Sequence, residues 1–150
     1  MKKILSVLTI LFALGTFTFA QKKKDDTEGS EKINVPSVVK TALAKKYPSA
    51  KKVTWEKEKG NYEANWGGKS GEDHSAQFSP SGAFIEMVDA ISVSSLPKNI
   101  AQYVASNYKG SKINEAGKVT DASGTETFEV ELKKKTLIFD LKGNFLRVEK

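Results

Sequence analysis

The sequence predicts an α+β fold made of one unit, a helix followed by four short antiparallel strands, that occurs twice. The first observation is a repeat, because apolar residues recur at a constant offset of 61 positions, as from Pro36 to Pro97 and from Phe84 to Phe145. The second is a pair of short segments with helical periodicity, each begun by one of these prolines. The third is the alternation of apolar and polar residues after each segment, which is typical of half-buried strands.

Two helices are expected, over residues 36–47 and 97–108. A proline at the first helical position is tolerated because its missing N–H would have no partner within the helix. Pro48 ends the first helix, and Gly110 follows the end of the second. The apolar residues expected on one face are Val39, Ala42, Leu43 and Tyr47 in the first helix and Ile100, Tyr103, Val104 and Tyr108 in the second.

Strand patterns follow each helix. The last strand of each unit carries Phe84 or Phe145 out of phase with the apolar residues that come after it, so it is expected to be apolar on both faces. Such a strand is either central and doubly buried or presents one face for recognition. The expected strands cover residues 52–58, 61–66, 74–79 and 83–89 in the first unit, and include 128–132, 137–139 and 145–148 in the second.

Residues 1–20 are expected to be a secretory signal peptide. Two lysines precede an apolar run, and small residues precede a cleavage site between Ala20 and Gln21. A transmembrane anchor is the alternative, but an apolar stretch of about 16 residues is short for a span of roughly 20. The protein is therefore expected to be secreted or periplasmic, with no integral membrane segment after signal removal.

Residues 21–34 are expected to be a flexible tether, because they contain almost no apolar residue and carry charges of both signs. The folded domain is expected over 35–150, divided into repeats over 35–95 and 96–150. Each repeat alone buries only a modest core, and the chain has no cysteine for a disulfide. We therefore expect one cooperative domain, which is monomeric.

The charge argues against a nucleic-acid partner. The formal net charge is +6, and it falls to +4 when Lys2 and Lys3 leave with the signal peptide. Arg147 is the single arginine, whereas phosphate and base recognition favours the planar arginine fork over the hydrated lysine ammonium. A solvated lysine-rich surface explains the charge, and weak attraction to acidic polymers or anionic membranes stays open.

No catalytic, cofactor or metal site is expected. His74 is the single histidine, and it would need a serine and a carboxylate for hydrolysis, or Glu72 and Asp73 for a metal. Neither G-x-S-x-G nor H-E-x-x-H is present to support such a role. A lone histidine at the start of a strand is more often an ordinary polar residue.

A partner-binding site is a hypothesis for the long loop of the first unit and for the doubly apolar strands. The loop has three glycines, which let its backbone approach another surface closely, and it follows a tryptophan that would anchor a partner. The alternatives are a merely flexible hairpin loop and aromatic residues that line the sheet beneath the helices. The candidate residues are Trp66, Gly67, Gly68, Lys69, Glu72, Asp73, Phe84 and Phe145.

The repeats resemble a known family. The stretch VPSVVKTALAKKYPSAKKVTW with YEANW, and LPKNIAQYVASNYKGSKI with FEVEL, are similar to the PepSY-like family described as β-lactamase-inhibitor-like. The resemblance covers residues 35–150 and implies helices packed on one face of a curved antiparallel sheet, without enzymatic activity. The inhibitor that lends the family its name has disulfides within its repeats, whereas this chain has no cysteine.

The function expected from these observations is that of an exported, non-enzymatic binding module, an inhibitor or modulator of an envelope or secreted protein. Its partner is expected to be a protein or peptide that the sequence does not identify. Two alternatives stay open. One is a structural protein that attaches to the envelope surface through its lysines, and the other is a small enzyme that uses His74.

Overall fold

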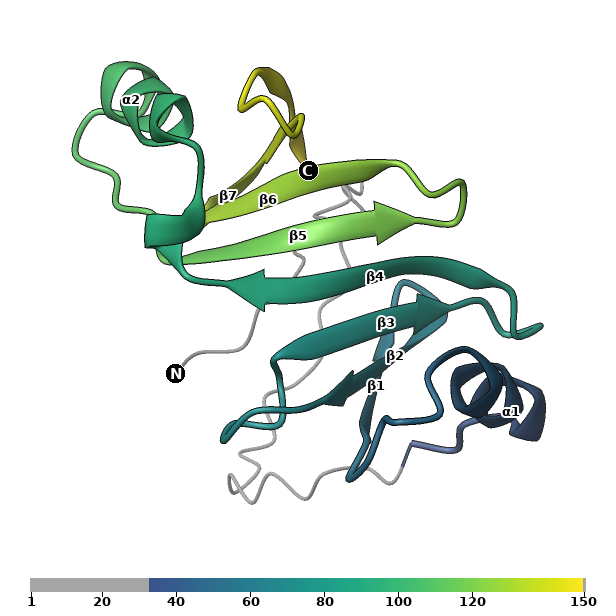
Figure 1. Ribbon diagram of the computed structural model, residues 1–150. Helices are drawn as coiled ribbons and strands as arrows, with labels where there is room; N and C mark the ends of the chain where they lie inside the picture. The colour runs from purple at the N-terminus through teal and green to yellow at the C-terminus, as the bar shows by residue number, and fades with distance from the viewer. Residues whose placement is uncertain (1–32, 150) are drawn as a thin grey trace, which may run out of the picture.

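The computed structural model describes residues 33–149 of the chain. The expected signal peptide, its cleavage site at Ala20 and Gln21, and all but the end of the expected tether lie outside these residues. Two α-helices and a short 3₁₀ helix accompany an 8-stranded antiparallel sheet whose strands follow one another in chain order (Figure 1). This α+β architecture, with one helix and four strands in each half, confirms the predicted fold class.

The elements of the first half are α1 (Ser37–Lys46), β1 (Thr54–Glu58), β2 (Asn61–Trp66), β3 (His74–Phe78) and β4 (Phe84–Ile91). The short 3₁₀ helix Val93–Ser95 joins the two halves. The elements of the second half are α2 (Lys98–Asn107), β5 (Glu115–Asp121), β6 (Glu126–Leu132), β7 (Lys135–Phe139) and β8 (Phe145–Glu149).

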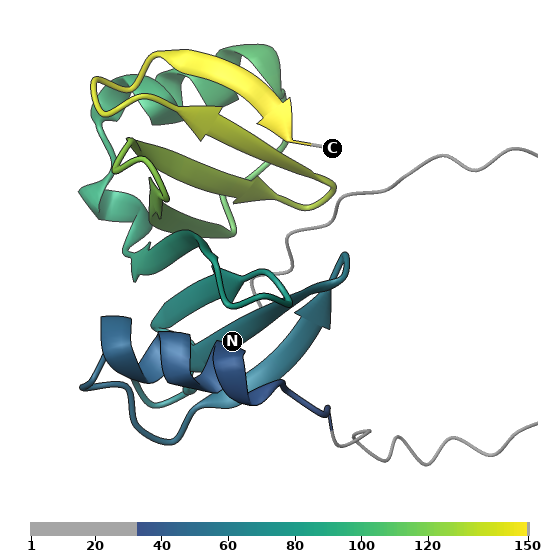
Figure 2. The same ribbon diagram turned by 90° about the vertical axis from the view of Figure 1, so that its right-hand side faces the viewer.

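The sheet is continuous across the two halves. Each strand pairs with the next, and β4 pairs with β5 from Glu86↔Asp121 to Ile91↔Ala116 at the junction. Helix α1 lies beside β1–β4 and helix α2 beside β5–β8, at opposite ends of the twisted sheet (Figures 1 and 2). Within the described part of the chain no helix has the length and apolar character to cross a membrane.

Each helix begins one residue later than its proline. Pro36 has a ψ of 145° and Pro97 a ψ of 135°, so both are N-caps rather than first helical residues as expected. The carbonyl of Pro36 accepts a hydrogen bond from the backbone N–H of Lys40 at 3.2 Å. Proline fits this position because it has no backbone N–H that would need a hydrogen-bond acceptor. Its fixed φ is also compatible with extended backbone.

The two helices bury their apolar faces in separate clusters. In the first half Val39 and Leu43 pack on strand residues, and in the second half Ile100 and Val104 do so. The apolar residues that alternate along the strands provide the other side of each cluster. These strand residues are Tyr62, Ala64, Trp66, Ala76, Phe78 and Met87 in the first half, and Ala116, Val130, Leu132, Leu137 and Phe139 in the second.

A β-bulge in the last strand of each half corrects the phase expected from the sequence. Gln77 pairs with Glu86 but Phe78 pairs with Phe84, so one extra residue lies on β4, and the same shift recurs between β7 and β8. The bulge places Phe84 on the same face as Met87, and both pack in the first cluster. Phe84 is therefore in phase with Met87, contrary to the expectation, while Val88 and Ala90 keep the opposite face of β4 partly apolar.

Candidate functional site

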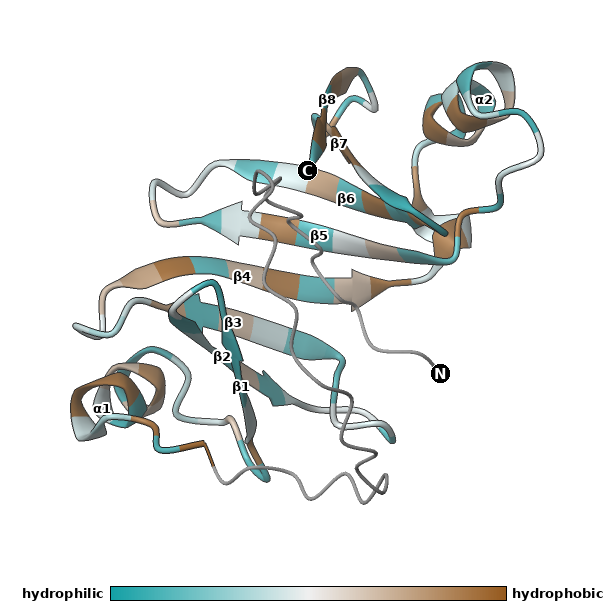
Figure 3. Cartoon of the chain, turned by 180° about the vertical axis from the view of Figure 1, so that it is seen from behind, coloured by the Kyte–Doolittle hydropathy of each residue, from teal (hydrophilic) through white to brown (hydrophobic). Residues whose placement is uncertain are grey.

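The sheet face that points away from the helices carries nine acidic side chains of the described strands. Successive strand residues point to opposite faces, so the residues between those of the apolar clusters all lie on this second face. The alternation is visible as bands of differing hydropathy along the strands in Figure 3. We call this surface the carboxylate face; its acidic strand residues are Glu56, Glu58, Glu63, Glu86, Glu115, Asp121, Glu129, Glu131 and Glu149.

Several of these carboxylates stand directly opposite one another on neighbouring strands. Like charges at such cross-strand positions destabilise a sheet. Lysines of the strands lie on the opposite face, and Arg147 is the one cationic strand residue of the carboxylate face in the described chain. The directly opposed acidic pairs are Glu56 with Glu63, Glu86 with Asp121 and Glu115 with Glu131.

Two small adjoining hollows open on the carboxylate face, and both are lined by Val88 and Glu129. The larger, which we call the central hollow, has a volume of about 30 Å³. A site for a drug-sized ligand occupies several hundred Å³, so the central hollow accepts only a small group. Its other lining residues are Glu58, Glu63, Glu72, Ser75, Gln77, Glu86 and Ala90.

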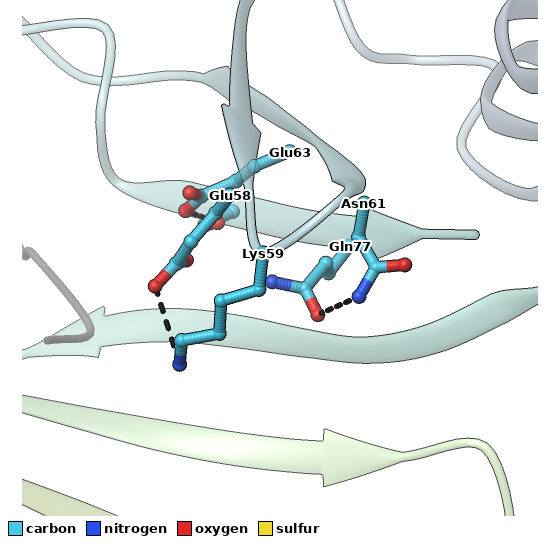
Figure 4. Close-up of polar contacts among 6 residues, drawn as sticks. Glu58, Lys59, Asn61, Glu63 and Gln77 are labelled. Atoms are coloured by element: carbon cyan, nitrogen blue, oxygen red, sulfur yellow. Dashed lines mark hydrogen bonds and ion pairs between the residues drawn. The ribbon is translucent and has the colours of Figure 1, made fainter. Parts of the chain in front are cut away.

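On the first-half side of the central hollow the polar groups contact one another. The hydroxyl of Ser75 donates a hydrogen bond to Glu63 Oε1, and Asn61 Nδ2 donates to Gln77 Oε1 at 3.4 Å. Figure 4 shows Lys59 and Glu58 pointing toward each other, with Nζ and Oε1 3.4 Å apart. Burial raises the pKa of Glu63, while the hydrogen bond from Ser75 opposes the rise.

Glu129 has a different environment on the second-half side of the hollow. The residue is 9% exposed, and no residue within 33–149 forms a hydrogen bond or ion pair with its carboxyl. Burial, followed by the negative charges of Glu149 and Glu86, raises the pKa of Glu129 to about 8. The carboxyl is therefore largely protonated at neutral pH.

The neighbouring carboxyls show the same tendency. Burial is the main cause that raises the pKa values of Glu86, Glu115 and Glu131. Oε2 of Glu115 and Oε2 of Glu131 are both buried without a hydrogen-bond partner in the described structure. The carboxylate face thus holds acidic groups that solvent and the rest of the fold stabilise poorly.

The residues expected to bind a partner do not lie together. Trp66 is 7% exposed, and its ring packs 5.4 Å from that of Tyr47 beneath α1, so little of it is available to a partner. Phe84 and Phe145 also pack against the apolar clusters on the helix side of the sheet. For Trp66 this position agrees with the alternative from the sequence, in which the aromatic residue lines the sheet beneath the helices.

The long loop remains a predicted binding element. Gly67 and Gly68 have φ values of 87° and 63°, and a Cβ on Gly68 would overlap the Asp73 carboxylate, so glycine is required there. Lys69 and Asp73 are exposed, whereas Glu72 lines the central hollow. Glu72 is therefore the expected loop residue that the structure brings to the carboxylate face.

His74 lies on the helix side of the sheet. Its Nδ1 is 2.7 Å from Asp89 Oδ1, and its ring is 5.6 Å from that of Trp66. Asp89 is thus its acidic partner, in place of the Glu72 and Asp73 considered from the sequence. Within residues 33–149 no serine hydroxyl bonds to His74, and no three acidic or histidine side chains converge closely enough to hold a metal ion.

The carboxylate face was not predicted from the sequence, although the alternation that places its glutamates on one side of a strand can be read there. Glutamates alternate with apolar residues in FEVEL, and Glu63 stands between Tyr62 and Ala64 in YEANW, which identifies the polar side of each strand. The sequence alone does not show which strands are neighbours, so it does not reveal that these glutamates form one surface.

The comparisons with known proteins agree with the architecture. The model of the family described as "Putative beta-lactamase-inhibitor-like, PepSY-like" matches residues 26–67 and 69–147. A protein from Bacteroides eggerthii described as "putative periplasmic" has a similar structure, with a TM-score of 0.63 and 20% identity over 77% of this chain and 88% of that one. No curated protein matches the chain at sequence level.

Two further solved structures share the fold. A DUF2874 family protein from Bacteroides ovatus has a TM-score of 0.62 at 18% identity, over 77% of this chain and 87% of that one. A BLIP-like protein from Bacteroides fragilis has a TM-score of 0.59 at 19% identity, over 77% of this chain and 86% of that one. At these identities the likeness concerns the fold.

Proposed function

Because the chain belongs to the PepSY-like, β-lactamase-inhibitor-like family, we propose that it is a non-enzymatic binding module of the cell envelope. The proposed binding surface is the carboxylate face of the sheet, and the proposed partner is a protein. A periplasmic location is supported by the description of the similar protein from Bacteroides eggerthii. The name of the BLIP-like protein from Bacteroides fragilis supports a role as inhibitor or modulator.

The observation that carries the proposal is the set of directly opposed acidic pairs, such as Glu56 with Glu63 and Glu115 with Glu131. Each such pair lowers the stability of the sheet, and the helices pack on the other face. Residues that break a local rule of stability without a structural gain are expected at functional sites. A partner that covers the carboxylate face would supply contacts to Glu115 and Glu131, each of which has one buried oxygen without a hydrogen-bond partner within residues 33–149.

The shape of the surface also supports a protein partner. The carboxylate face extends over strands from both halves, and its hollows are too small for a drug-sized molecule. Glu72 extends the surface from the sheet to the long loop, whose glycines allow close backbone approach. The loop is therefore proposed as one rim of the interface.

Site-specific photocrosslinking in the producing cells tests the proposal. A photoreactive amino acid replaces Gln77, which lies on the carboxylate face, or Gln102, which is exposed on α2. We expect one adduct of defined mass from position 77 and none from position 102. An adduct from position 102 alone, or the same adduct from both positions, would place the partner elsewhere.

A further inference from the structure

The carboxylate face has a negative charge that the chain as a whole does not have. The formal net charge of the sequence is +6, yet Arg147 is the one cationic strand residue on this face in the described part of the chain. Lys59 approaches from the β1–β2 turn and contacts Glu58. An electropositive partner segment would be attracted to this face and not to the lysine-rich remainder.

Glu129 is a second, independent indication of a ligand. Its side chain is about nine-tenths buried, lines both hollows and has no hydrogen-bond or ion-pair partner within residues 33–149. Buried carboxyls are ordinarily paired or hydrogen-bonded, because an unpaired one costs the fold its desolvation energy. The equivalent glutamate of the first half, Glu63, has such a partner in Ser75.

The strands beside Glu129 leave space over its carboxyl. Its direct neighbours are Gly117 on β5 and Ile138 on β7, so neither neighbour offers a polar side chain. A Cβ on Gly117 would lie 2.6 Å from Val88 Cγ1, so glycine allows Val88 to occupy the space beside the hollow. The hollow therefore combines an acidic group with an apolar wall.

We propose that the hollow beside Glu129 binds the cationic end of a lysine or arginine side chain from a basic segment of the partner protein. This inference rests on the proposed function of the carboxylate face. The stem of such a side chain would pack on Val88 and Ala90 while its charged end reaches the carboxyls. A volume of about 30 Å³ suits a single ammonium or guanidinium group.

A metal ion fits the arrangement less well. Calcium takes six to eight oxygen ligands at roughly 2.3–2.6 Å, which requires several carboxylates to converge on one point. Within residues 33–149 no three acidic or histidine groups do so. The acidic groups that surround Glu129 are instead distributed over several strands, as Glu58, Glu63, Glu86, Glu131 and Glu149.

Binding of a cation at this point would be linked to proton release. Glu129 faces Glu58 on β1, Glu63 on β2, Glu86 on β4, Glu115 on β5, Glu131 on β6, and Arg147 and Glu149 on β8. The burial that raises its pKa keeps it protonated at neutral pH. An ammonium beside it favours the ionised form, so the complex holds fewer protons than its separate components.

Titration of the exported chain with a blocked octalysine peptide, followed by amide NMR, tests the inference. We expect saturable shifts centred on Glu129 and Gly117, proton release at pH 7 measured by calorimetry in buffers of different ionisation enthalpy, and no shifts with an octaglutamate peptide. The Glu129→Gln variant should weaken octalysine binding about tenfold, as expected for loss of one charge-assisted contact.

Glu126→Gln is the matched control, because Glu126 lies on the same strand, on the opposite face, in an exposed pair with Lys118. It should leave octalysine binding unchanged. If Glu129→Gln does not fold, Glu131→Gln replaces it. Equal loss in both glutamine variants, or shifts centred on other residues, would overturn the inference. So would saturable calcium binding at Glu129 without octalysine binding.

These outcomes differ from failure of the proposed function. If the photocrosslinked partner still depends on the carboxylate face but octalysine does not bind, the inference fails and the proposed function stands. If the partner crosslinks only outside this face, the proposed function fails whatever octalysine does.

Discussion

Glu63 and Glu129 occupy equivalent positions in the two repeats, yet their carboxyl groups differ in hydrogen bonding. Glu63 follows Tyr62, which pairs with Phe78, and Glu129 follows Phe128, which pairs with Phe139; Phe78 and Phe139 are 61 positions apart in the repeat. The Ser75 hydroxyl donates a hydrogen bond to Glu63. Thr136, which lies 61 positions after Ser75, forms no such bond with Glu129 in the described structure.

This difference predicts how the two carboxyls titrate. Ser75→Ala should raise the pKa of Glu63 further, because the bond that opposes the effect of burial is lost. It should also lower the free energy of unfolding by about 1 kcal/mol. Carbon-detected NMR titration of the glutamate carboxyls measures the pKa. Thr136→Val is the control and should leave the pKa of Glu129 unchanged; a shift there would mean that Thr136 already bonds to it.

The buried carboxyl of Glu129 predicts a loss of stability as the pH rises. Its folded pKa of about 8 exceeds the value of 4.5 for an unperturbed glutamate, so between these values the folded chain binds more protons than the unfolded chain. Raising the pH through this range therefore favours unfolding, by a few kcal/mol at about 1.4 kcal/mol per pKa unit.

Glu129→Gln should flatten this dependence, so that the variant is more stable than the wild type at pH 8. Urea denaturation between pH 5 and 8.5 measures the effect, and Glu126→Gln serves as control because its exposed carboxyl pairs with Lys118. A wild-type stability that rises with pH across this range would contradict the assigned environment of Glu129.

The two repeats have separate apolar clusters but share one continuous sheet. We predict that they unfold together, as one cooperative domain. Ile100 is fully buried in the second cluster, so Ile100→Ala should cost about 2–5 kcal/mol. The two tryptophans, Trp55 and Trp66, both belong to the first half. Their fluorescence should report the same lower unfolding midpoint as far-ultraviolet circular dichroism. An unchanged tryptophan transition would show that the repeats unfold independently.

We predict that the long loop contributes less to partner binding than the carboxylate face of the sheet does. Glu72→Gln should weaken binding of the photocrosslinked partner about twofold to threefold, because the charge of a half-buried group at the rim is partly screened by solvent. Lys69→Ala is the matched loop control, since Lys69 is exposed and does not line the hollows. Calorimetry measures both affinities. A loss for Lys69→Ala equal to that for Glu72→Gln would assign the contribution to the loop as a whole.

The sequence predicts much of the architecture because the repeat and the hydrophobic periodicity are local signals. Strand β2 was predicted with the observed bounds, Asn61–Trp66, because apolar and polar residues alternate strictly along it. Strand β5, Glu115–Asp121, was not located, since Gly117 and Lys118 interrupt its apolar pattern. Leu146 is the extra residue of the bulge in β8, so the sequence alone does not show which residues of β8 share a face with Phe145. The bulge depends on pairing with the neighbouring strand β7.

The candidate site was predicted less well than the fold. The apparent anchor Trp66 is a core residue, because α1 covers the face to which the alternation assigns it. The carboxylate face depends on register: Glu86 stands opposite Asp121 only because β4 pairs with β5 across the two repeats. Contacts between distant strands of this kind are set by tertiary structure and have no signal within either segment alone.

The most direct test of the carboxylate face is the affinity of the photocrosslinked partner for two matched double variants. Glu63→Gln/Glu129→Gln removes two carboxyl groups from the carboxylate face, and Asp89→Asn/Glu126→Gln removes two from the helix side, so both variants lose the same number of acidic groups. We predict that the first variant binds the partner at least about tenfold more weakly and the second as the wild type does. Equal affinities for the two variants would contradict the assignment of the binding surface.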